Sequence, residues 1–144
     1  MGAKAEFKIR NSFASQTFMK SIRAELLTVK DGYVEVGLPF NAGLLQHTTF
    51  IHGSVIAGIA DTACGYACIS LAQVNEEMVT LEYKINFLKP AKGTYFKASA
   101  RVLKNGARIK VAYCEVTNER TEIVALVTAS IMVVNLNIDK PDIG

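Results

Sequence analysis

HGSVIAGIADTACGYACISL, the stretch from His52 to Leu71, reads as one helix with a single charged residue, Asp61, among small and apolar side chains. A helix that is apolar on every side is buried on every side, so we expect this helix to form the centre of the core. A lone carboxylate inside such a helix is costly unless another group pairs with it or a reaction uses it. Asp61 is therefore a candidate functional residue.

The whole chain has the composition of a globular protein. Its 144 residues are 50% hydrophobic and 20% charged, which predicts one domain over residues 1–144, with 1–8 and 136–144 as loose ends. The formal net charge of +3 is too small to indicate nucleic-acid binding, but it suits an anionic small ligand. The start of the chain lacks the pattern of a secretory signal, and Asp61 in mid-helix argues against a membrane span.

The three cysteines, Cys64, Cys68 and Cys114, have neither the number nor the spacing of a disulfide framework. A zinc site would need further Cys or His ligands at suitable spacing, and the sequence offers none. We therefore expect buried, reduced thiols that pack as small apolar groups, and neither a metal nor a cofactor. Reduced thiols in turn predict a cytoplasmic protein.

Periodicity and turn residues give the remaining elements. In chain order we expect helix 11–22, strands 24–30 and 33–39, loop 40–51, helix 52–71, and strands 79–88, 94–104, 108–117 and 122–135. Asp31-Gly32 and Asn105-Gly106 are the expected hairpin turns. Phe13, Phe18 and Met19 are expected to face inward from the first helix. No helix separates the last four strands, so we expect an antiparallel meander and an α+β fold.

The strand over residues 79–88 is sharply two-sided. Its apolar face carries Val79, Leu81, Tyr83, Ile85 and Phe87, and its polar face carries Thr80, Glu82, Lys84 and Asn86. The strand over residues 122–135 is almost continuously apolar instead, as expected for a strand in the interior of a sheet.

Two segments together resemble the hotdog-fold acyl-CoA thioesterases of the phenylacetic-acid-degradation (PaaI-like) branch. They are HGSVIAGIAD from His52 and VTLEYKINFLKPA from Val79. The family pattern is His-Gly-Gly, a run of small apolar residues and Asp, followed by a strand that ends in Phe-hydrophobic-basic-Pro. The likeness extends over residues 36–134, with two departures: Ser54 replaces the second glycine, and Gln46 stands where this branch often has Asn.

The resemblance implies a curved antiparallel sheet wrapped around the long central helix, and a homodimer or homotetramer. It also implies an enzyme that hydrolyses the thioester of a small aromatic or medium-chain acyl-CoA. Two other functions stay open. One is a non-catalytic acyl-CoA binding module, and the other is a hotdog hydratase or dehydratase, for which His47 and His52 are the available histidines.

The family's catalytic positions fall on five residues: Gln46, His52, Gly53, Asp61 and Thr80. Because a helix N-terminus offers unpaired backbone N–H groups, the N–H of Gly53 is the expected oxyanion donor. Asp61 is the expected general base or nucleophile. Gln46 would orient the water or the carbonyl, His52 would orient the loop, and Thr80 would hold the water.

Five further residues are expected to bind the substrate: Ser54, Tyr66, Lys89, Lys104 and Arg108. Lysine and arginine at strand ends suit the phosphates of coenzyme A, although each of them alone fits a solvated rim equally well. Tyr66 fits either an acyl pocket or ordinary core packing.

Gly53 and Asp61 are too far apart on one helix to act on the same carbonyl. Eight helical residues separate them by roughly 12 Å along the axis and about 80° around it. A reacting group must lie within about 3 Å of both the donor and the base. A two-fold dimer resolves this if Asp61 of one chain faces Gly53 and Gln46 of the other, so we expect composite active sites.

Overall fold

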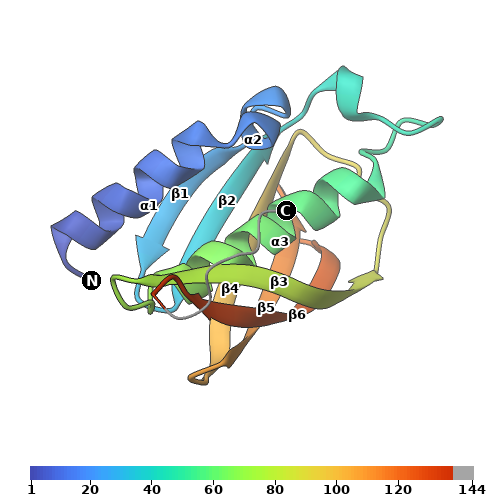
Figure 1. Ribbon diagram of the computed structural model, residues 1–144. Coiled ribbons are helices and arrows are strands. Elements are labelled where there is room, and N and C mark those ends of the chain that lie inside the picture. Colours follow the sequence, from blue (N-terminus) through green and yellow to red (C-terminus); the bar gives the residue numbers. More distant parts are fainter. Residues whose placement is uncertain (138–144) are drawn as a thin grey trace, which may run out of the picture.

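The computed structural model describes residues 1–137 as one curved six-stranded sheet with a long helix lying across it (Figure 1). The elements are α1 (Ala3–Ser15), α2 (Thr17–Ser21), β1 (Glu25–Lys30), β2 (Tyr33–Pro39), the 3-10 turn η1 (Ala42–Leu44), α3 (Gly53–Ile69), β3 (Glu76–Phe87), β4 (Tyr95–Asn105), β5 (Ile109–Asn118) and β6 (Ile123–Asn135). The predicted α+β class, with a curved antiparallel sheet around a central helix, is confirmed.

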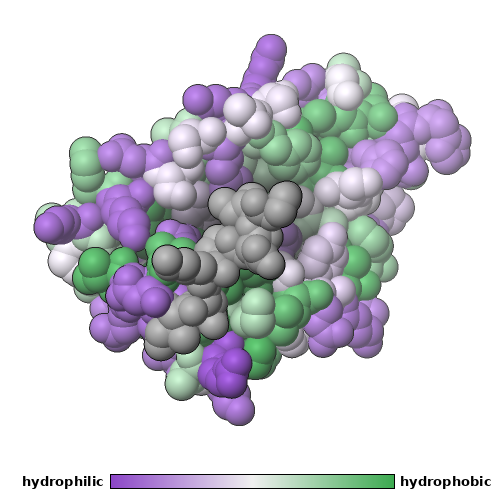
Figure 2. Space-filling view, in the orientation of Figure 1, coloured by the Kyte–Doolittle hydropathy of each residue, from purple (hydrophilic) through white to green (hydrophobic). Residues whose placement is uncertain are grey.

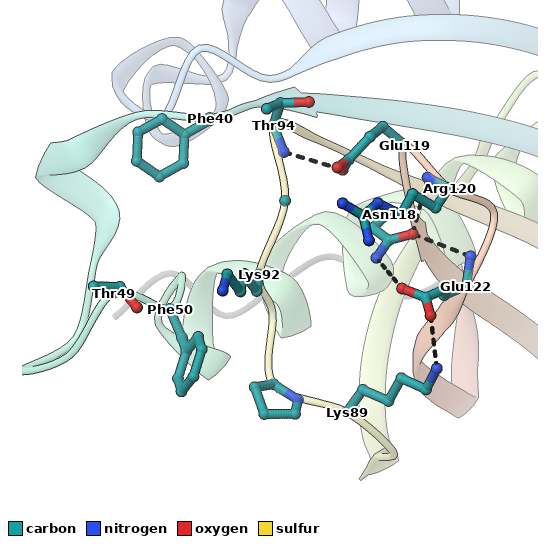
Figure 3. A pocket seen from close by; sticks show the side chains of 12 residues that line it. Phe40, Thr49, Phe50, Lys89, Lys92, Thr94, Asn118, Glu119, Arg120 and Glu122 are labelled. Atoms are coloured by element: carbon teal, nitrogen blue, oxygen red, sulfur yellow. Dashed lines mark hydrogen bonds and ion pairs between the residues drawn. The ribbon is translucent and has the colours of Figure 1, made fainter.

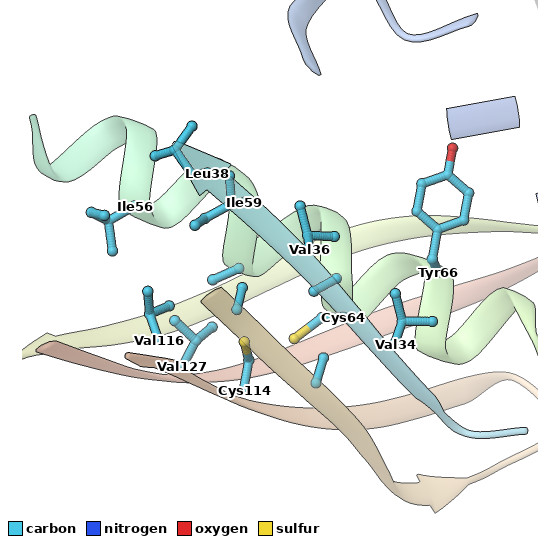
Figure 4. Packing of buried hydrophobic residues seen from close by; sticks show 14 of the residues in the cluster. Val34, Val36, Leu38, Ile56, Ile59, Cys64, Tyr66, Cys114, Val116 and Val127 are labelled. Atoms are coloured by element: carbon cyan, nitrogen blue, oxygen red, sulfur yellow. The ribbon is translucent and has the colours of Figure 1, made fainter. Parts of the chain in front are cut away.

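The core lies between α3 and the concave face of the sheet. The helix contacts every strand from β2 to β6. Ile56, Ile59 and Cys64 of α3 are fully buried, and so are the strand residues Val36 and Val127, which Figure 4 labels beside the helix. Val34, Val36 and Leu38, which alternate along β2, are all fully buried, so one face of this strand lies on the core.

One strip of α3 is not covered by the sheet, so the expectation that this helix is buried on every side is wrong in part. Gly58, Asp61, Thr62 and Gly65 are partly exposed, and their spacing of three or four residues puts them on one face. The helix α2 reaches this strip through Phe18, whose ring lies 3.0 Å from where a side chain on Gly58 would begin. The carboxylate of Asp61 is therefore open to water on an otherwise buried helix.

The N-terminal segment is helical earlier than predicted. The helix α1 begins at Ala3, whereas we expected a helix from residue 11 and loose residues at 1–8. The reason is packing, because Ile9 and Phe13, four residues apart on one helix face, are both buried. The apolar side chain of Ile9 thus extends the helix toward the N-terminus.

A break at Gln16 divides the expected single helix into α1 and α2. The side-chain amide of Gln16 donates a hydrogen bond of 2.8 Å to the hydroxyl of Tyr66, and the hydroxyl of Ser12 lies 3.0 Å from the same oxygen. These contacts fasten the end of α1 to α3. Met19 is buried as predicted, but Phe18, which we expected to face inward, is 51% exposed over the open strip of α3.

The strands are all antiparallel and follow the order β1-β2-β4-β5-β6-β3. The predicted turns at Asp31-Gly32 and Asn105-Gly106 join β1 to β2 and β4 to β5. The predicted meander is correct for β4, β5 and β6 but wrong for β3, which pairs with β6 and forms an edge of the sheet. Because β3 covers its far side, β6 is an interior strand, as its apolar sequence predicted.

Strand β3 contains a bulge that changes which side chains face α3. Its pairing with β6 shifts between Thr80 and Glu82. Thr80 bonds to Asp61 of α3 before the bulge, and Phe87 packs over Gly53 of α3 after it. Residues seven apart in a regular strand face opposite sides, so the bulge reverses the alternation. The prediction that Thr80 lies on the face opposite Phe87 is therefore wrong.

Much of the predicted apolar face of β3 is exposed. Val79, Leu81, Tyr83 and Phe87 are between 43% and 53% exposed, and Leu88 just beyond the strand is 54% exposed. The cause is the position of β3 at the edge of the sheet, where one side of the strand has no neighbour. Figure 2 shows this hydrophobic surface over β3.

The three cysteines are free and buried, as predicted. The neighbouring Cys114 thiol and burial raise the pKa of Cys64, and burial raises the pKa of Cys68 to about 12, so both thiols stay protonated at neutral pH. Within residues 1–137, no cluster of three His, Cys, Asp or Glu side chains is placed to hold a metal, and no helix is long and apolar enough to cross a membrane. The expected loose tail at 136–144 lies mostly outside the described residues.

Candidate active site

The carboxylate of Asp61 is held by one contact from the neighbouring strand. Its Oδ1 accepts a hydrogen bond of 2.8 Å from the hydroxyl of Thr80, which lies just before the bulge of β3. Its Oδ2 has no hydrogen-bond partner within residues 1–137. One oxygen is thus fixed and the other is free to meet a water molecule or a substrate. Thr80, which we expected to hold a water, instead donates directly to the carboxylate.

The start of α3 presents a free backbone donor. His52 caps the helix, because its Nδ1 accepts a hydrogen bond of 3.0 Å from the N–H of Ser54 and its carbonyl accepts the N–H of Val55 at 2.9 Å. No acceptor contacts the N–H of Gly53 in the described part of the chain. The positive end of the helix dipole lies at the same place, so this N–H is suited to bind a developing negative charge.

His52 and Ser54 act together at this helix start. The Ser54 hydroxyl lies 2.6 Å from Nδ1 of His52, beside the backbone N–H that the same nitrogen accepts. The backbone N–H of His52 in turn donates to the carbonyl of Leu44 at 2.8 Å. These contacts hold the loop against the helix, which fits the orienting role expected for His52.

Phe87 gives the reason for glycine at position 53. Three atoms of its ring lie between 3.1 and 3.7 Å from where a Cβ on Gly53 would be. A side chain there would push the ring away and cover the approach to the backbone. Close packing against Phe87 and an accessible backbone N–H therefore both require glycine at position 53.

Gly53 borders a cavity of about 350 Å³ at one end of the sheet. The cavity is lined by Gln46, Ile51, Gly53, Phe87, Leu88, Lys89, Pro90 and Ala91. The N–H of Gln46 donates to the carbonyl of Phe50 at 3.0 Å, which closes the loop that presents the Gln46 side chain. The structure thus brings together three of the predicted site residues: Gln46, Gly53 and Lys89.

Asp61 and Thr80 do not line this cavity. The helix α3 is unbroken from Gly53 to Ile69, so the helical spacing of roughly 12 Å between Gly53 and Asp61 applies. One chain therefore holds two halves of a hydrolytic site that do not meet. The first half, at the cavity, is the N–H of Gly53 with the amide of Gln46. The second half, further along α3, is the carboxylate of Asp61 with the hydroxyl of Thr80.

Tyr66 lies in the core. Its ring is 3% exposed, packs 6.0 Å from the ring of Phe13 between centroids, and leaves α3 on the side away from the strands (Figure 4). Its hydroxyl is occupied by Ser12 and Gln16. Of the two readings of Tyr66, the structure favours core packing over the acyl pocket.

Lys104 and Arg108 lie far from the cavity within one chain. They flank the β4–β5 hairpin, and Ile109 next to it pairs with Met132 of β6. Met132 also pairs with Val79, eight residues along β3 from Phe87. The hairpin is therefore at the opposite end of the sheet from the cavity, and the predicted basic residues do not form one cluster.

A second cavity, of about 680 Å³, adjoins the first and shares Lys89 and Pro90 with it. Three residues that line it were not predicted as site residues: Phe40, Phe50 and Arg120. They come from the separate loops at 40–50 and 118–122, so only the folded sheet brings them next to Lys92. The run KPAK at 89–92 is the one local signal that pointed to this place.

The sequence model of the family described as "Thioesterase superfamily" matches residues 48–125. The chain is 31% identical over 98 residues to the medium/long-chain acyl-CoA thioesterase YigI of Escherichia coli (strain K12), which is 59% of this chain and 63% of YigI. It is 27% identical over 127 residues to the acyl-coenzyme A thioesterase PaaI of the same strain, which is 88% of this chain and 89% of PaaI.

Among solved structures, a thioesterase family protein from Silicibacter pomeroyi superposes with a TM-score of 0.87 at 34% sequence identity, over 91% of this chain and 98% of that one. The superposed part is larger than the region that the family model matches. The chain spans just under two thirds of the length of YigI and of its bacterial counterparts.

Proposed function

The chain belongs to the thioesterase superfamily and has its hotdog fold, and from this premise we propose that it is an acyl-CoA thioesterase. The proposed reaction is hydrolysis of an acyl-CoA to a free acid and coenzyme A. The observation that carries the proposal is Asp61: a carboxylate on a helix of small and apolar residues, fixed at one oxygen by Thr80 and free at the other. Such an arrangement is suited to activate water.

The proposed chemistry uses a donor and a base on opposite sides of the thioester. Oδ2 of Asp61 takes a proton from water as the water attacks the carbonyl carbon, or attacks that carbon itself to form an acyl-enzyme. The carbonyl oxygen gains negative charge and accepts the free N–H of Gly53. The carbon–sulfur bond then breaks and the thiolate of coenzyme A leaves. In the second route, water then hydrolyses the acyl-enzyme, which releases the acid and restores the carboxylate of Asp61. Gln46, in the same cavity as Gly53, orients the carbonyl or the water.

We propose that each site is completed by a second copy of the chain. The edge strand β3 exposes a row of apolar side chains and its unpaired backbone groups, as strands that pair with another chain do. Pairing of β3 with β3 of a second copy about a two-fold axis would continue the sheet. It would also bring the Asp61–Thr80 pair of one copy toward the Gly53 and Phe87 end of the other, because β3 carries both.

Charges on β3 support one register for this pairing. A two-fold axis through Tyr83 sets Glu82 opposite Lys84 of the second copy and gives two attractive pairs by symmetry. An axis through Lys84 would set two lysines opposite each other, which is unfavourable. The first register also places two tyrosine rings beside each other, a favourable cross-strand pair.

The acyl group is the less constrained part of the substrate. The open strip of α3 that carries Asp61 is bordered by the half-exposed ring of Phe18, which lies over Gly58 one helical turn before Asp61. This apolar surface supports the proposal of a small aromatic or medium-chain acyl group. In this reading Phe18 limits the length of the acyl group.

A panel of acyl-CoA esters, assayed for release of free thiol, tests the proposal. We expect turnover with aromatic and medium-chain esters, and a shift toward longer chains in the variant Phe18→Ala. Tight binding of these esters without release of thiol would instead identify a binding module. Hydration of an unsaturated acyl-CoA without cleavage would identify a hydratase.

A further inference from the structure

The larger cavity at the end of the sheet has no part in the chemistry proposed above. Its volume of about 680 Å³ lies in the usual range for small-molecule sites. Figure 3 shows Phe40 and Phe50 on one side of the segment 89–94, with Lys92 between them, and the turn with Asn118, Glu119, Arg120 and Glu122 on the other side. Phe40 is 47% exposed, so its ring is open to a ligand in the cavity.

The carboxylates around this cavity are already engaged. Glu122 accepts hydrogen bonds of 2.9 Å from both Lys89 and Asn118, and Glu119 accepts the backbone N–H of Thr94 at 3.0 Å. Backbone N–H groups, including its own, lower the pKa of Glu119, and the contacts from Asn118 and Lys89 lower that of Glu122. Both carboxylates are therefore ionised and partnered at neutral pH.

Two cations of the cavity remain available. The side chains of Lys92 and Arg120 make no hydrogen bond or ion pair within residues 1–137. Lys92 lies beside the two phenylalanines, and Arg120 lies at the turn between β5 and β6. With three cations against two carboxylates, the lining of the cavity has a positive balance. The charge of Arg120 helps to lower the pKa of Glu119 and of Glu122, but its guanidinium N–H groups are left to bind a ligand.

From this juxtaposition of free cations and exposed aromatic rings, we infer that the larger cavity binds the nucleotide of the substrate, the 3′-phosphorylated ADP of coenzyme A. The inference rests on the proposed function and states which part of the substrate binds in the larger cavity. Lys92 and Arg120 meet the phosphates as charge-assisted donors. Phe40 and Phe50 provide the surface against which the adenine stacks.

The position of the cavity suits a substrate that reaches from the nucleotide to the thioester. Lys89 and Pro90 border both cavities, so the two spaces are neighbours on this segment. The carbonyl of Phe50 also accepts the N–H of Gln46, so one loop contributes an aromatic ring to the larger cavity and an amide to the smaller one. An acyl group on a carrier protein is not attached to a nucleotide, so such a substrate would leave this cavity empty. The inference therefore favours coenzyme A over an acyl carrier protein as the leaving group.

Comparing acyl-CoA with the same acyl group on pantetheine, which lacks the nucleotide, tests the inference. In Lys92→Ala and Arg120→Ala we expect KM for acyl-CoA to rise about tenfold each while kcat stays within about twofold, the pattern of lost uniform binding. Neither variant should change KM for acyl-pantetheine. Phe40→Ala should behave in the same way, and added salt should weaken acyl-CoA binding in the wild-type chain more than in Lys92→Ala.

Lys8→Ala and Lys30→Ala are the matched controls, because they remove equal charges from α1 and β1, and neither residue lines a cavity or lies on the edge strand β3. The inference would be overturned if Lys92→Ala raised KM equally for acyl-CoA and for acyl-pantetheine. It would also be overturned if only the control variants raised KM selectively for acyl-CoA. Calorimetric binding of coenzyme A and of pantetheine to the same variants separates this inference from the proposed function. If the chain binds coenzyme A through Lys92 but hydrolyses no ester, the inferred nucleotide site stands and the proposed activity is wrong. If wild type and Lys92→Ala bind coenzyme A equally well, the inferred nucleotide site is wrong.

Discussion

The hydroxyl of Thr80 donates a hydrogen bond of 2.8 Å to the carboxylate of Asp61, and this bond joins the central helix to the edge strand β3. It depends on the bulge beside Thr80, which turns that side chain toward α3 although Phe87 on the same strand also faces the helix. Bulges often re-aim a side chain next to a functional site. The contact fixes one oxygen of Asp61 and leaves the other free.

Replacing Thr80 tests whether this contact positions the carboxylate. In Thr80→Val, which keeps the shape of the side chain, we expect kcat for the best acyl-CoA to fall about tenfold, because a hydrogen bond to a charged group is lost. KM should stay nearly constant, since Thr80 does not line the substrate cavities. Thr80→Ser retains the hydroxyl and should recover most of the rate. Equal losses in both variants would mean that the methyl group, and not the hydrogen bond, is what matters.

Asp61→Asn removes the proposed base without a large change of volume. We expect kcat to fall by about 10²–10⁴ while the melting temperature stays close to that of the wild type. Asp31→Asn, at the turn between β1 and β2, is the matched control and should leave kcat unchanged. Turnover by Asp61→Asn at nearly the wild-type rate would contradict the proposed chemistry.

The central helix, the predicted turns and the class of fold were all readable from the sequence, because each depends on local periodicity or on turn residues. Asp61 and Gly53 stood out for the same reason, since both lie in one short motif. The bulge at Thr80 was not readable, because it arises from pairing with β6, far along the chain. A regular alternation therefore put Thr80 on the wrong face.

The position of β3 explains the remaining errors. Four successive strands predict a meander, but β3 passes to the far edge, and its apolar residues lie where the sheet ends. The same crossing separates Lys104 and Arg108 from Lys89, which local sequence could not reveal. The larger cavity was missed because its aromatic and basic residues come from three loops that meet only in the folded chain.

Glu35 on the convex face of the sheet makes stability depend on pH. Burial alone would raise its pKa, but hydrogen bonds from Thr28, Lys97 and Tyr33 outweigh burial and lower it from 4.5 to about 2. A lowered pKa means that this stabilisation is present above about pH 4.5 and is lost as the pH falls through about 2. We expect Glu35→Gln to lower the free energy of unfolding by about 2 kcal/mol at pH 7.

Urea unfolding of Glu35→Gln between pH 7 and pH 2 measures this effect. The difference from wild type should shrink toward the acid end of the range, because both side chains are then neutral. The exposed Glu77, changed to Gln, is the control and should show no such trend. A difference that stays constant with pH would mean that packing, and not the charge of Glu35, is responsible.

The register proposed for β3 predicts a charge swap. Glu82→Lys alone and Lys84→Glu alone place like charges opposite each other at two symmetric positions, so each should weaken the dimer by roughly tenfold. The double variant restores opposite charges and should recover the wild-type dissociation constant. Sedimentation or light scattering across a dilution series measures it. Stronger association of Lys84→Ala than of wild type would instead place the axis at Lys84.

A composite site can be tested by mixing two inactive chains. Gln46→Ala disables the half at the cavity and Asp61→Asn disables the half on α3, and we expect each variant alone to be crippled. In a mixed dimer, one site combines both defects and the other combines the intact Gln46 of one copy with the intact Asp61 of the other. The mixture should therefore regain activity that neither parent has.

The size of the recovery is fixed by symmetry. Random pairing of equal amounts makes half of the dimers mixed, and each mixed dimer has one intact site of two, so about a quarter of the wild-type activity should return. Native mass spectrometry of the co-refolded sample shows whether mixed dimers have formed. If they have formed and no activity returns, Gly53, Gln46 and Asp61 act within one chain. The spacing of roughly 12 Å along α3 would then have to be closed by a rearrangement of the helix start, since no aspartate side chain spans it.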